Sequence, residues 1–495
     1  MLTSIHLIGV TLTVGLLLWV SWLSGRKVKD ARSFMTGSGS GSWMVGGALL
    51  GTLAGGQSTI GTAQLAFSFG LSAWWFTLGA GLGTLVLGLV YGAPLRRSGC
   101  TTLLEVVGHE YDRRAETVGS VLCLLGIFIS IVAQVLSSAA MISSFFGIGM
   151  MAAAVVGALL IMLFVLFGGI RSAGASGLVK LVLLYLCSIV AGVVVWHVAG
   201  GLGGLYDGLD TIRRTPTLAP LSGLTDAESI HQRYGSMVAR GALKDLGGCL
   251  SLVLGVVSTQ TYAQCIWSAR TDRHARRGAL ICALCIPVIG AACTLVGIYM
   301  RGHYVTTDEL QAMQQAGEQL PVGLGVIGNS AQAFPAFILR HLPSWLGGIM
   351  LGTLLVNIIG SGSGLSLGAA TILVRDVYSN VFGRLSARLS QLLLTRLTIV
   401  GLLLAAVVAA LSMHGSFIND LGFLSLGLRA VAILFPLSLA LWLPGRVRAQ
   451  AVVASMVLGT AAMLTANFAQ LPGDAVYYGL LVALLPLALR GQRRA

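Results

Sequence analysis

The sequence predicts an all-α polytopic membrane protein with about thirteen transmembrane helices. Its mean hydropathy is +0.87, and 56% of the 495 residues are hydrophobic while only 10% are charged. Apolar stretches of roughly 20 residues, the length that crosses a bilayer core, recur along the whole chain. Two of these stretches are interrupted by glycine and polar residues, which a membrane tolerates only where the backbone lines a protein cavity.

The apolar stretches are separated by polar connections, most of them short. The stretches cover residues 4–24, 43–68, 73–95, 117–145, 148–169, 178–199, 244–267, 278–300, 343–372, 391–412, 416–443, 450–469 and 475–489. Two connections are longer. Residues 200–243 show little periodicity, whereas 301–342 contains helix start signals at Thr307, Asp308 and Glu309. The run PAFILRHLPSWLGG (335–348) predicts a short interfacial helix with Trp345 at the membrane surface. The glycine–serine run at 37–42 follows no strand and has no lysine in register, so it predicts a flexible connector rather than a phosphate loop.

The net charge of +14 is a topology signal rather than a sign of nucleic-acid binding, because the basic residues lie in the connections. If the first connection is cytoplasmic, 23 of the 31 basic residues lie on the cytoplasmic side, seven lie outside and Arg429 lies within a span. The first span lacks a basic n-region and a cleavage site, so it is expected to be retained. We therefore expect a protein of the cytoplasmic membrane with the N-terminus outside and the C-terminus inside.

The second apolar stretch is broken at its centre by polar residues and by glycine, which removes the steric bias toward a continuous helix. The residues concerned are Gly51, Gly55, Gly56, Gln57, Ser58 and Thr59. Broken spans expose backbone carbonyls and amides, and secondary transporters build ion and solute sites from them. A kinked packing helix is the alternative, since glycine and serine also mediate close helix contacts.

A second polar interruption, LGVVSTQTYAQ at 254–264, begins the later half of the chain. Spans 43–199 and 244–443 form two sets of five that start on opposite sides of the membrane. Interruptions in corresponding positions of two inverted halves indicate a central binding site. Both helices are predicted to unwind, near Ala54–Gln57 and near Val257–Gln260. One extra span and a loop (1–42) precede the repeats, outer segments 200–243 and 301–342 interrupt them, and 444–495 adds two spans and a basic tail.

Four local motifs resemble the sodium:solute symporter family, which includes proline, pantothenate, sugar and sialic acid transporters. They are GRKVKDARSFMTGSGSGSW (25–43), FGGIRSAGASGLVK (167–180), STQTYAQCIWSARTDRHARRGA (258–279) and SGSGLSLGAATILVRDVYSNVF (361–382). The motifs occur in the family's order at matching topological positions. The resemblance implies the LeuT-type fold, with its inverted five-plus-five helix repeat.

The resemblance also implies a sodium site between the first broken helix and the eighth core helix. It places backbone carbonyls at Gly51, Ala54 and Asn357 and hydroxyls at positions 360 and 361. The family usually has two adjacent hydroxyls, but this chain has Gly360 followed by Ser361. Sodium prefers several oxygen ligands, so the loss of one weakens the site unless water or the Asn357 amide oxygen replaces it.

A second departure lies in the fifth core helix. The family's aspartate falls on Gly177 and its glutamine on Lys180, so a carboxylate is lost and an ammonium is gained one turn away. One interpretation is that Lys180 snorkels at the cytoplasmic end of its span. The other is that its ammonium takes the place of the cation, which would make transport proton-coupled or uncoupled.

Further polar residues within spans are candidates for solute contacts. Arg429 lies at mid-span, where an arginine is costly and suits a carboxylate, so an anionic solute is a hypothesis; pairing with backbone carbonyls is the structural alternative. Gln57 and Ser58 lie in the first break. Gln134 is either a solute contact or an interhelical hydrogen bond. The resemblance adds Gln260 and Tyr262 in the second broken helix.

These observations favour a secondary active transporter, a symporter that moves a small organic solute by alternating access with sodium as the coupling ion. Proton-coupled or facilitative transport with a degraded sodium site is the alternative, and a membrane solute sensor that acts with a separate partner is a hypothesis from another class. A channel is disfavoured by two broken helices in inverted halves. An enzyme is not expected, because there is no nucleophile–base pair, metal cluster or cofactor loop, and no cofactor or nucleic-acid partner is predicted.

Overall fold

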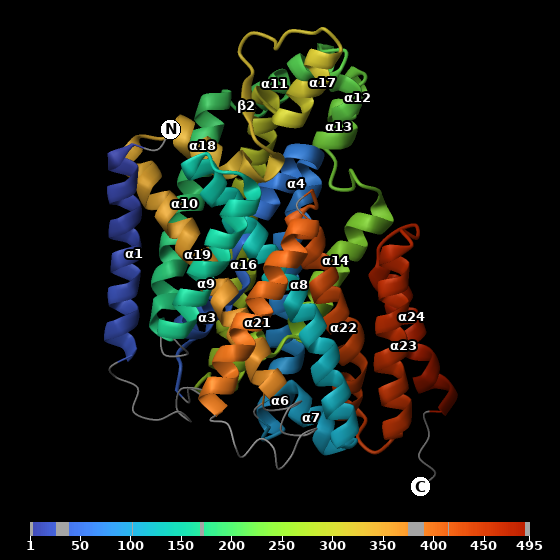
Figure 1. Cartoon of the computed structure of the whole chain (residues 1–495). Coiled ribbons are helices and arrows are strands. Elements are labelled where there is room, and N and C mark those ends of the chain that lie inside the picture. Colours follow the sequence, from blue (N-terminus) through green and yellow to red (C-terminus); the bar gives the residue numbers. More distant parts are fainter. Residues whose placement is uncertain are drawn as a thin grey trace.

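The structure, a computed structural model, describes residues 3–25, 39–100, 102–168, 173–374, 391–413 and 415–490. Long helices run roughly side by side, and short helices lie at both ends of the bundle (Figure 1). Within the described residues, eight helices are long and apolar enough to cross a membrane, or nine if one bent pair is a single span. The protein is therefore a multi-pass membrane protein. Each of the thirteen predicted stretches falls on helical segments of the structure. That all thirteen cross the membrane stays a prediction.

The first half of the chain contains α1 (Ser4–Gly25), α3 (Ser42–Leu53), η1 (Gln57–Gly61), α4 (Thr62–Phe69), η2 (Gly70–Trp74), α5 (Trp75–Val86), η3 (Leu87–Tyr91), α6 (Gly92–Arg97), α7 (Leu103–Glu110), α8 (Arg113–Phe146), α9 (Met150–Gly168) and α10 (Ala173–Ala199). α11 (Leu202–Arg214), α12 (Leu218–Ser222) and α13 (Ala227–Tyr234) follow.

The second half contains α14 (Ala242–Val257), α15 (Gln260–Trp267), α16 (Asp272–His303), β1 (Tyr304–Thr306), α17 (Thr307–Gln315), β2 (Gly325–Ile327), η5 (Ser330–Gln332), α18 (Ala333–His341), α19 (Ser344–Thr371), α21 (Gln391–Ser412), α22 (Ile418–Trp442), α23 (Ala449–Phe468) and α24 (Ala475–Arg490). β1 and β2 form a parallel pair in which Tyr304 lies opposite Gly325.

The long helices have clear end signals in the sequence. The Asp112 side chain accepts a hydrogen bond from the Ala115 amide at the start of α8, and Gly147 ends that helix with a φ of 64°. At 34 residues, α8 is about 50 Å long and extends beyond a bilayer core of about 30 Å. The run Gln57–Arg97 is too long for one crossing, and Gly70, with a φ of 63°, divides it.

Both predicted helix breaks are present, although they are shorter than expected. α3 ends at Leu53, Ala54 and Gly55 leave the helix, and the chain continues at Gln57 as one turn of π-helix. The prediction that the chain is unwound as far as Gln57 is therefore wrong. Wider π turns of this kind occur at functional positions inside helices. In the second half, Ser258 and Thr259 separate α14 from α15, and the two helices meet at 49°.

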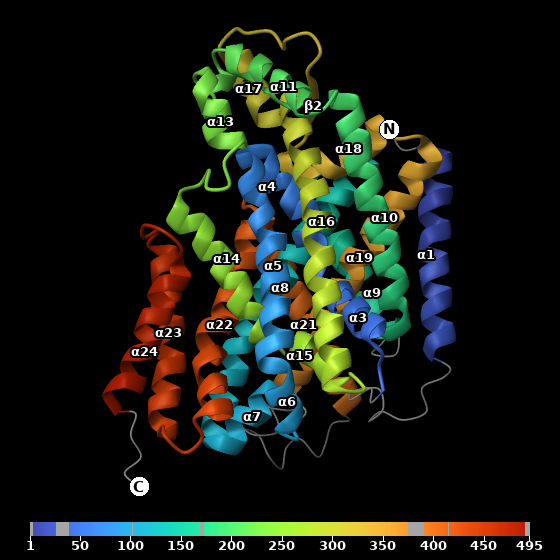
Figure 2. The ribbon, with the colours of Figure 1, turned by 180° about the vertical axis from the view of Figure 1, so that it is seen from behind.

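The two long connections fold together into a cap at one end of the bundle (Figures 1 and 2). The segment 200–243, expected to have little periodicity, contains three helices, because Leu205, Leu209 and Ile212 recur at helical spacing and are buried. The start of α17 is as predicted, since Thr306 and Glu309 form a capping box. α1 begins at the capped end, whereas α24 ends at the opposite end.

Candidate functional site

The first helix break lies among polar groups of α8 and α19. The Ala54 carbonyl, freed by the break, accepts a hydrogen bond from Asn357 Nδ2. The Gly56 amide donates to Gln134 Oε1 at 3.1 Å. Ser58, a predicted solute contact, donates to the Leu53 carbonyl at 2.9 Å and so satisfies the end of α3. Two of the orphan backbone groups of the break are thus bound by amide side chains of neighbouring helices.

The second break is held by Arg429 in the middle of α22. Its guanidinium donates from Nη1 to Thr259 Oγ1 (3.1 Å), from Nη2 to the hydroxyls of Ser130 (2.8 Å) and Ser425 (2.6 Å), and from Nε to the Ser425 carbonyl (3.1 Å). Only 1% of the Arg429 surface is exposed. In the part of the chain that the structure describes, these partners are hydroxyls and one carbonyl, and none is a carboxylate.

Helix α8 connects the two breaks. Ser130 binds Arg429 and Gln134 binds Gly56, and these two α8 residues are four positions apart on one helix face. The breaks are therefore separated along α8 by about one helical turn, roughly 5–6 Å. The predicted repeat layout requires such an approach of two interrupted helices at the bundle centre.

Several buried polar atoms beside the breaks have no hydrogen-bond partner among the residues that the structure describes. They are Gln57 Nε2 at the first break, Ser258 Oγ at the second, Ser361 Oγ on α19 and Asn419 Oδ1 on α22. Leaving such groups unpaired costs free energy, so they are candidates for contact with a ligand or with water. The sequence analysis named Gln57 and Ser361, and it missed Asn419, Ser130 and Ser425 because single hydroxyls and amides are common in packed membrane helices.

Two further residues, Gln260 and Tyr262, were predicted to contact the solute. The Gln260 side chain accepts a hydrogen bond from the Leu103 amide at 2.7 Å, so Gln260 helps to satisfy the start of α7. Tyr262 is buried in α15 and close enough to Arg429 to interact electrostatically. Gly51 lies in α3 one turn before Ala54.

Lys180 extends from α10 to the α19 position where the resemblance expected a hydroxyl. A methyl group built on Gly360 would lie only 2.1 Å from Lys180 Nζ. A methyl group on Gly55 would lie 3.1 Å from Ser361 Oγ, so the lysine, Ser361 and the first break share one neighbourhood. Lys180 Nζ also lies 5.7 Å from the centre of the Phe164 ring. The ammonium therefore lies beside α19.

The centre of the bundle carries cations without acids. None of the 17 acidic residues of the sequence falls in the middle of a predicted span. Asp245 and Asp420 lie in the first turns of α14 and α22, where Arg240 pairs with both at 2.7 and 2.6 Å. Lys180 and Arg429 are therefore basic side chains near the helix breaks without an acidic residue at mid-span.

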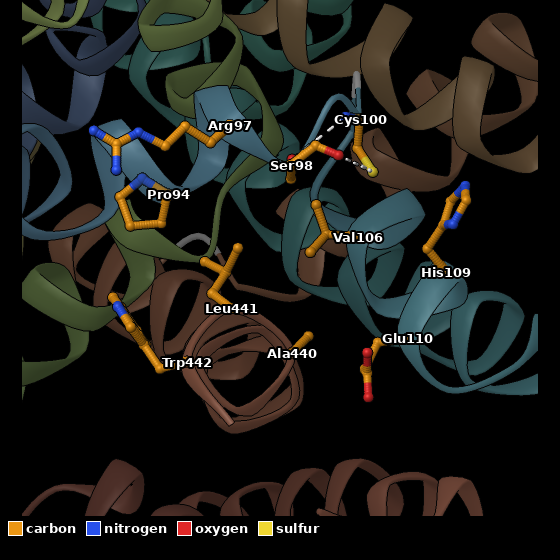
Figure 3. A pocket seen from close by; sticks show the side chains of 10 residues that line it. All are labelled: Pro94, Arg97, Ser98, Cys100, Val106, His109, Glu110, Ala440, Leu441 and Trp442. Atoms are coloured by element: carbon orange, nitrogen blue, oxygen red, sulfur yellow. Dashed lines mark hydrogen bonds between the residues drawn. The ribbon is translucent and has the colours of Figure 1, made fainter. Parts of the chain in front are cut away.

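A hollow of about 610 Å³ opens away from the breaks, near α6, α7 and the end of α22 (Figure 3). Pro94, Arg97, Ser98, Cys100, Val106, His109, Glu110, Ala440, Leu441 and Trp442 line it. None of these residues is a predicted site residue, and the hollow lies at the end of the bundle opposite the cap.

The architecture is that of a helical membrane protein with two broken helices beside one central helix. The chain matches the family model of the Sodium:solute symporter family over residues 34–459. A sodium/glucose cotransporter of Vibrio parahaemolyticus is 21% identical over 379 residues, which cover 74% of this chain and 67% of that protein. The chain belongs to the Sodium:solute symporter family, as its four motifs suggested, and the family consists of transporters, not enzymes.

Two solved structures support the fold. A Na⁺-coupled sialic acid symporter in a substrate-bound outward-open state aligns with a TM-score of 0.73 at 16% identity, over 99% of this chain and 97% of that one. Mhp1, a nucleobase-cation-symport-1 family transporter, aligns with a TM-score of 0.52 at 13% identity, over 90% of this chain and 91% of that one.

Family membership supports sodium coupling, and the residues at the predicted position allow its fit to be tested. The Ala54 carbonyl accepts from an amide N–H, so Asn357 presents a donor where an oxygen was expected to replace the missing ligand. Of the two hydroxyl positions only Ser361 remains. An ammonium lies at the other, and two unit charges 4 Å apart repel by about 4 kcal/mol at an effective dielectric constant of 20. These residues do not fit a sodium ion while Lys180 is in place.

Proposed function

We propose that this protein is a secondary transporter that moves a small organic solute across the cytoplasmic membrane by alternating access. The observation that carries the proposal is the meeting of two helix breaks at α8, through Gln134 on one side and through Ser130 and Arg429 on the other. Broken helices of this kind let one part of a bundle rock against another around a fixed site.

The proposed solute is an anion, such as a small carboxylate. Arg429 is fully buried and has hydroxyl partners, and a second cation, Lys180, lies beside Gly360 of α19. Burying a guanidinium without a counter-charge is costly, and an anion bound between the breaks would supply that charge. Gln57 Nε2, buried without a partner, is a further donor for such a ligand.

The proposed orientation places the cap outside and the C-terminal end of α24 in the cytoplasm. The excess of basic residues on the side opposite the cap supports this orientation. The family name supports sodium as the coupling ion, whereas the position of Lys180 favours the alternative of transport without sodium at this site.

Solute binding and uptake test this proposal. Purified protein would be screened by thermal shift against carboxylates, amino acids, sugars and nucleobases, and each hit would be offered in radiolabelled form to proteoliposomes. Saturable uptake that is accelerated by unlabelled solute inside the vesicles is expected, because counterflow requires alternating access. Binding without uptake would indicate a sensor, and uptake without saturation would indicate a channel; either would overturn the proposal.

A further inference from the structure

We infer that the Lys180 ammonium is a resident cation that takes the place of sodium between the first helix break and α19. Solute transport then does not require sodium at this position. The inference rests on the proposed transport function but concerns only what supplies the positive charge there. The family name implies a sodium ion, but the residues of this chain at the predicted sodium position do not fit one, and the inference follows from that difference.

The first argument is steric. Lys180 Nζ lies 2.1 Å from the place where a side chain at position 360 would begin, so the ammonium and a serine side chain cannot both occupy that space. With glycine at 360, the ammonium fills the space in which the resemblance expected a hydroxyl. A lysine that only snorkelled to the membrane surface would require no glycine on α19.

The second argument concerns the remaining ligands. The Ala54 carbonyl, which the resemblance assigned to the ion, accepts a hydrogen bond from Asn357. Ser361 Oγ is buried and has no hydrogen-bond partner within the described residues, and it is the one hydroxyl present of the two that the resemblance implies. An ammonium needs acceptors in a similar way to sodium, but it is tethered, so it brings the charge without any loss of ion-binding entropy.

The third argument is electrostatic. No acidic residue lies in the middle of a predicted span, so no carboxylate there would neutralise a second cation beside Lys180. Repulsion between unit charges about 4 Å apart at an intermediate dielectric constant weakens binding by about a thousandfold. After a thousandfold loss of affinity, a site that binds sodium in the millimolar range would no longer bind it.

The consequence is a fixed link between α10 and α19. In a sodium-coupled protein a bound ion would link α10 and α19 only while it is bound. The sodium concentration then shifts the equilibrium between the two access states. A tethered ammonium holds the two helices together at all sodium concentrations. The solute gradient alone, or exchange of one solute for another, then drives transport.

The test measures sodium dependence with and without the ammonium. The native chain, Lys180→Ala with Gly360→Ser, and the control Lys244→Ala, a change at an exposed lysine of α14, would be purified. Melting temperature would be recorded in sodium and in choline chloride, together with binding of radioactive sodium. The native chain and the control are expected to show no sodium effect. The double variant is expected to gain sodium-dependent stabilisation and sodium binding.

A milder variant guards against misfolding of the double variant. Gly360→Ala retains the lysine but places a methyl group where the ammonium lies, so it should displace the ammonium and change solute affinity without removing charge. Sodium stabilisation of the native chain at low millimolar concentration, unchanged by Lys180→Ala, would overturn the inference. The sodium-dependent melting temperature and sodium binding need no solute, so absence of uptake in every variant would instead contradict the proposed transport function.

Discussion

The two helix breaks are built differently. At the first, between Ala54 and Gly56, the chain has no side-chain hydroxyl or charge, and the backbone itself is bound by Asn357 and Gln134. At the second, between Ser258 and Thr259, hydroxyl side chains are present, and a guanidinium binds one of them. Each break has a cation nearby, but Lys180 arrives from α10 over a flexible chain, whereas Arg429 is fixed by four hydrogen bonds.

This difference separates two roles for a buried positive charge. A planar guanidinium with several donors can position a helix break and still direct one face toward a ligand, whereas lysine, a point charge on a flexible stem, supplies charge without fixing the backbone of the break. The first break is therefore the more adaptable of the two, and the second is the better anchor for a solute. Changes at the two breaks should accordingly affect different measurements.

The largest effect is expected at Arg429. Arg429→Gln should abolish uptake, by about a hundredfold or more, because the charge for the anion is lost, while the glutamine amide can still bond Ser130 and Thr259. Uptake in proteoliposomes and the yield of monodisperse protein would be measured together. Arg214→Gln, in which an arginine side chain that is 74% exposed is changed, is the matched control.

Equal loss of yield and uptake in Arg429→Gln would assign the arginine a structural role. Breaking a buried polar network by removing one partner typically costs about 3–5 kcal/mol. Arg429→Lys distinguishes the two cases further, because it retains the charge but not the bonds to two helices. Solute binding that survives in this variant supports the anion hypothesis.

The next effect tests the first break through its glycines. A methyl group at Gly56 would lie 2.4 Å from the Ser137 side chain, so Gly56→Ala should destabilise the protein by about 1–3 kcal/mol and lower its melting temperature. Adding Ser137→Gly should restore most of this loss. The control is Gly364→Ala on α19, where a methyl group meets nothing within 4 Å and helix propensity should slightly raise stability.

A smaller effect separates the two glutamines that were predicted to contact the solute. Gln134→Leu removes the acceptor for the Gly56 amide and should weaken solute affinity about tenfold, since the break loses its position. Gln260→Leu acts on the start of α7 and should lower melting temperature without changing solute affinity. Equal changes in affinity for both variants would contradict the distinction between the two breaks.

Much of this architecture was predictable, because apolar length and glycine placement are local properties of the sequence. The breaks at Ala54 and Ser258 and the start of α17 follow from such signals. The hydrogen-bond partners were not predictable in the same way. Whether Gln260 faces a solute or the Leu103 amide depends on how α7 packs against α15. The local sequence of each helix does not determine that packing.

The helices of segment 200–243 and the position of Lys180 likewise depend on packing that the sequence alone does not determine. The segment 200–243 was expected to have little periodicity, although Leu205 and Leu209 already mark the buried face of α11. For Lys180, the sequence left snorkelling and cation replacement open, and its long side chain allows both. Only the place of its ammonium beside Gly360 favours one of them.

The smallest effect concerns how α14, which leads to the second break, is held at its outer end. Asp474 lies in the connection before α24, accepts from the Val476 amide at 2.9 Å and receives a long bond of 3.5 Å from Ser251 of α14. Burial raises the pKa of the Asp474 carboxyl above its ordinary value. A raised pKa in the folded state means that the acid form is favoured there, so its contribution to stability is present at low pH and is lost as pH rises through the folded pKa.

Asp474→Asn keeps the acceptor without the charge, and it should therefore raise the melting temperature by about 1 °C at pH 7.5 and change it less at pH 5. A decrease at pH 7.5 would show that the ionised carboxylate stabilises α14, and the second break would then depend on two charges of opposite sign rather than on Arg429 alone.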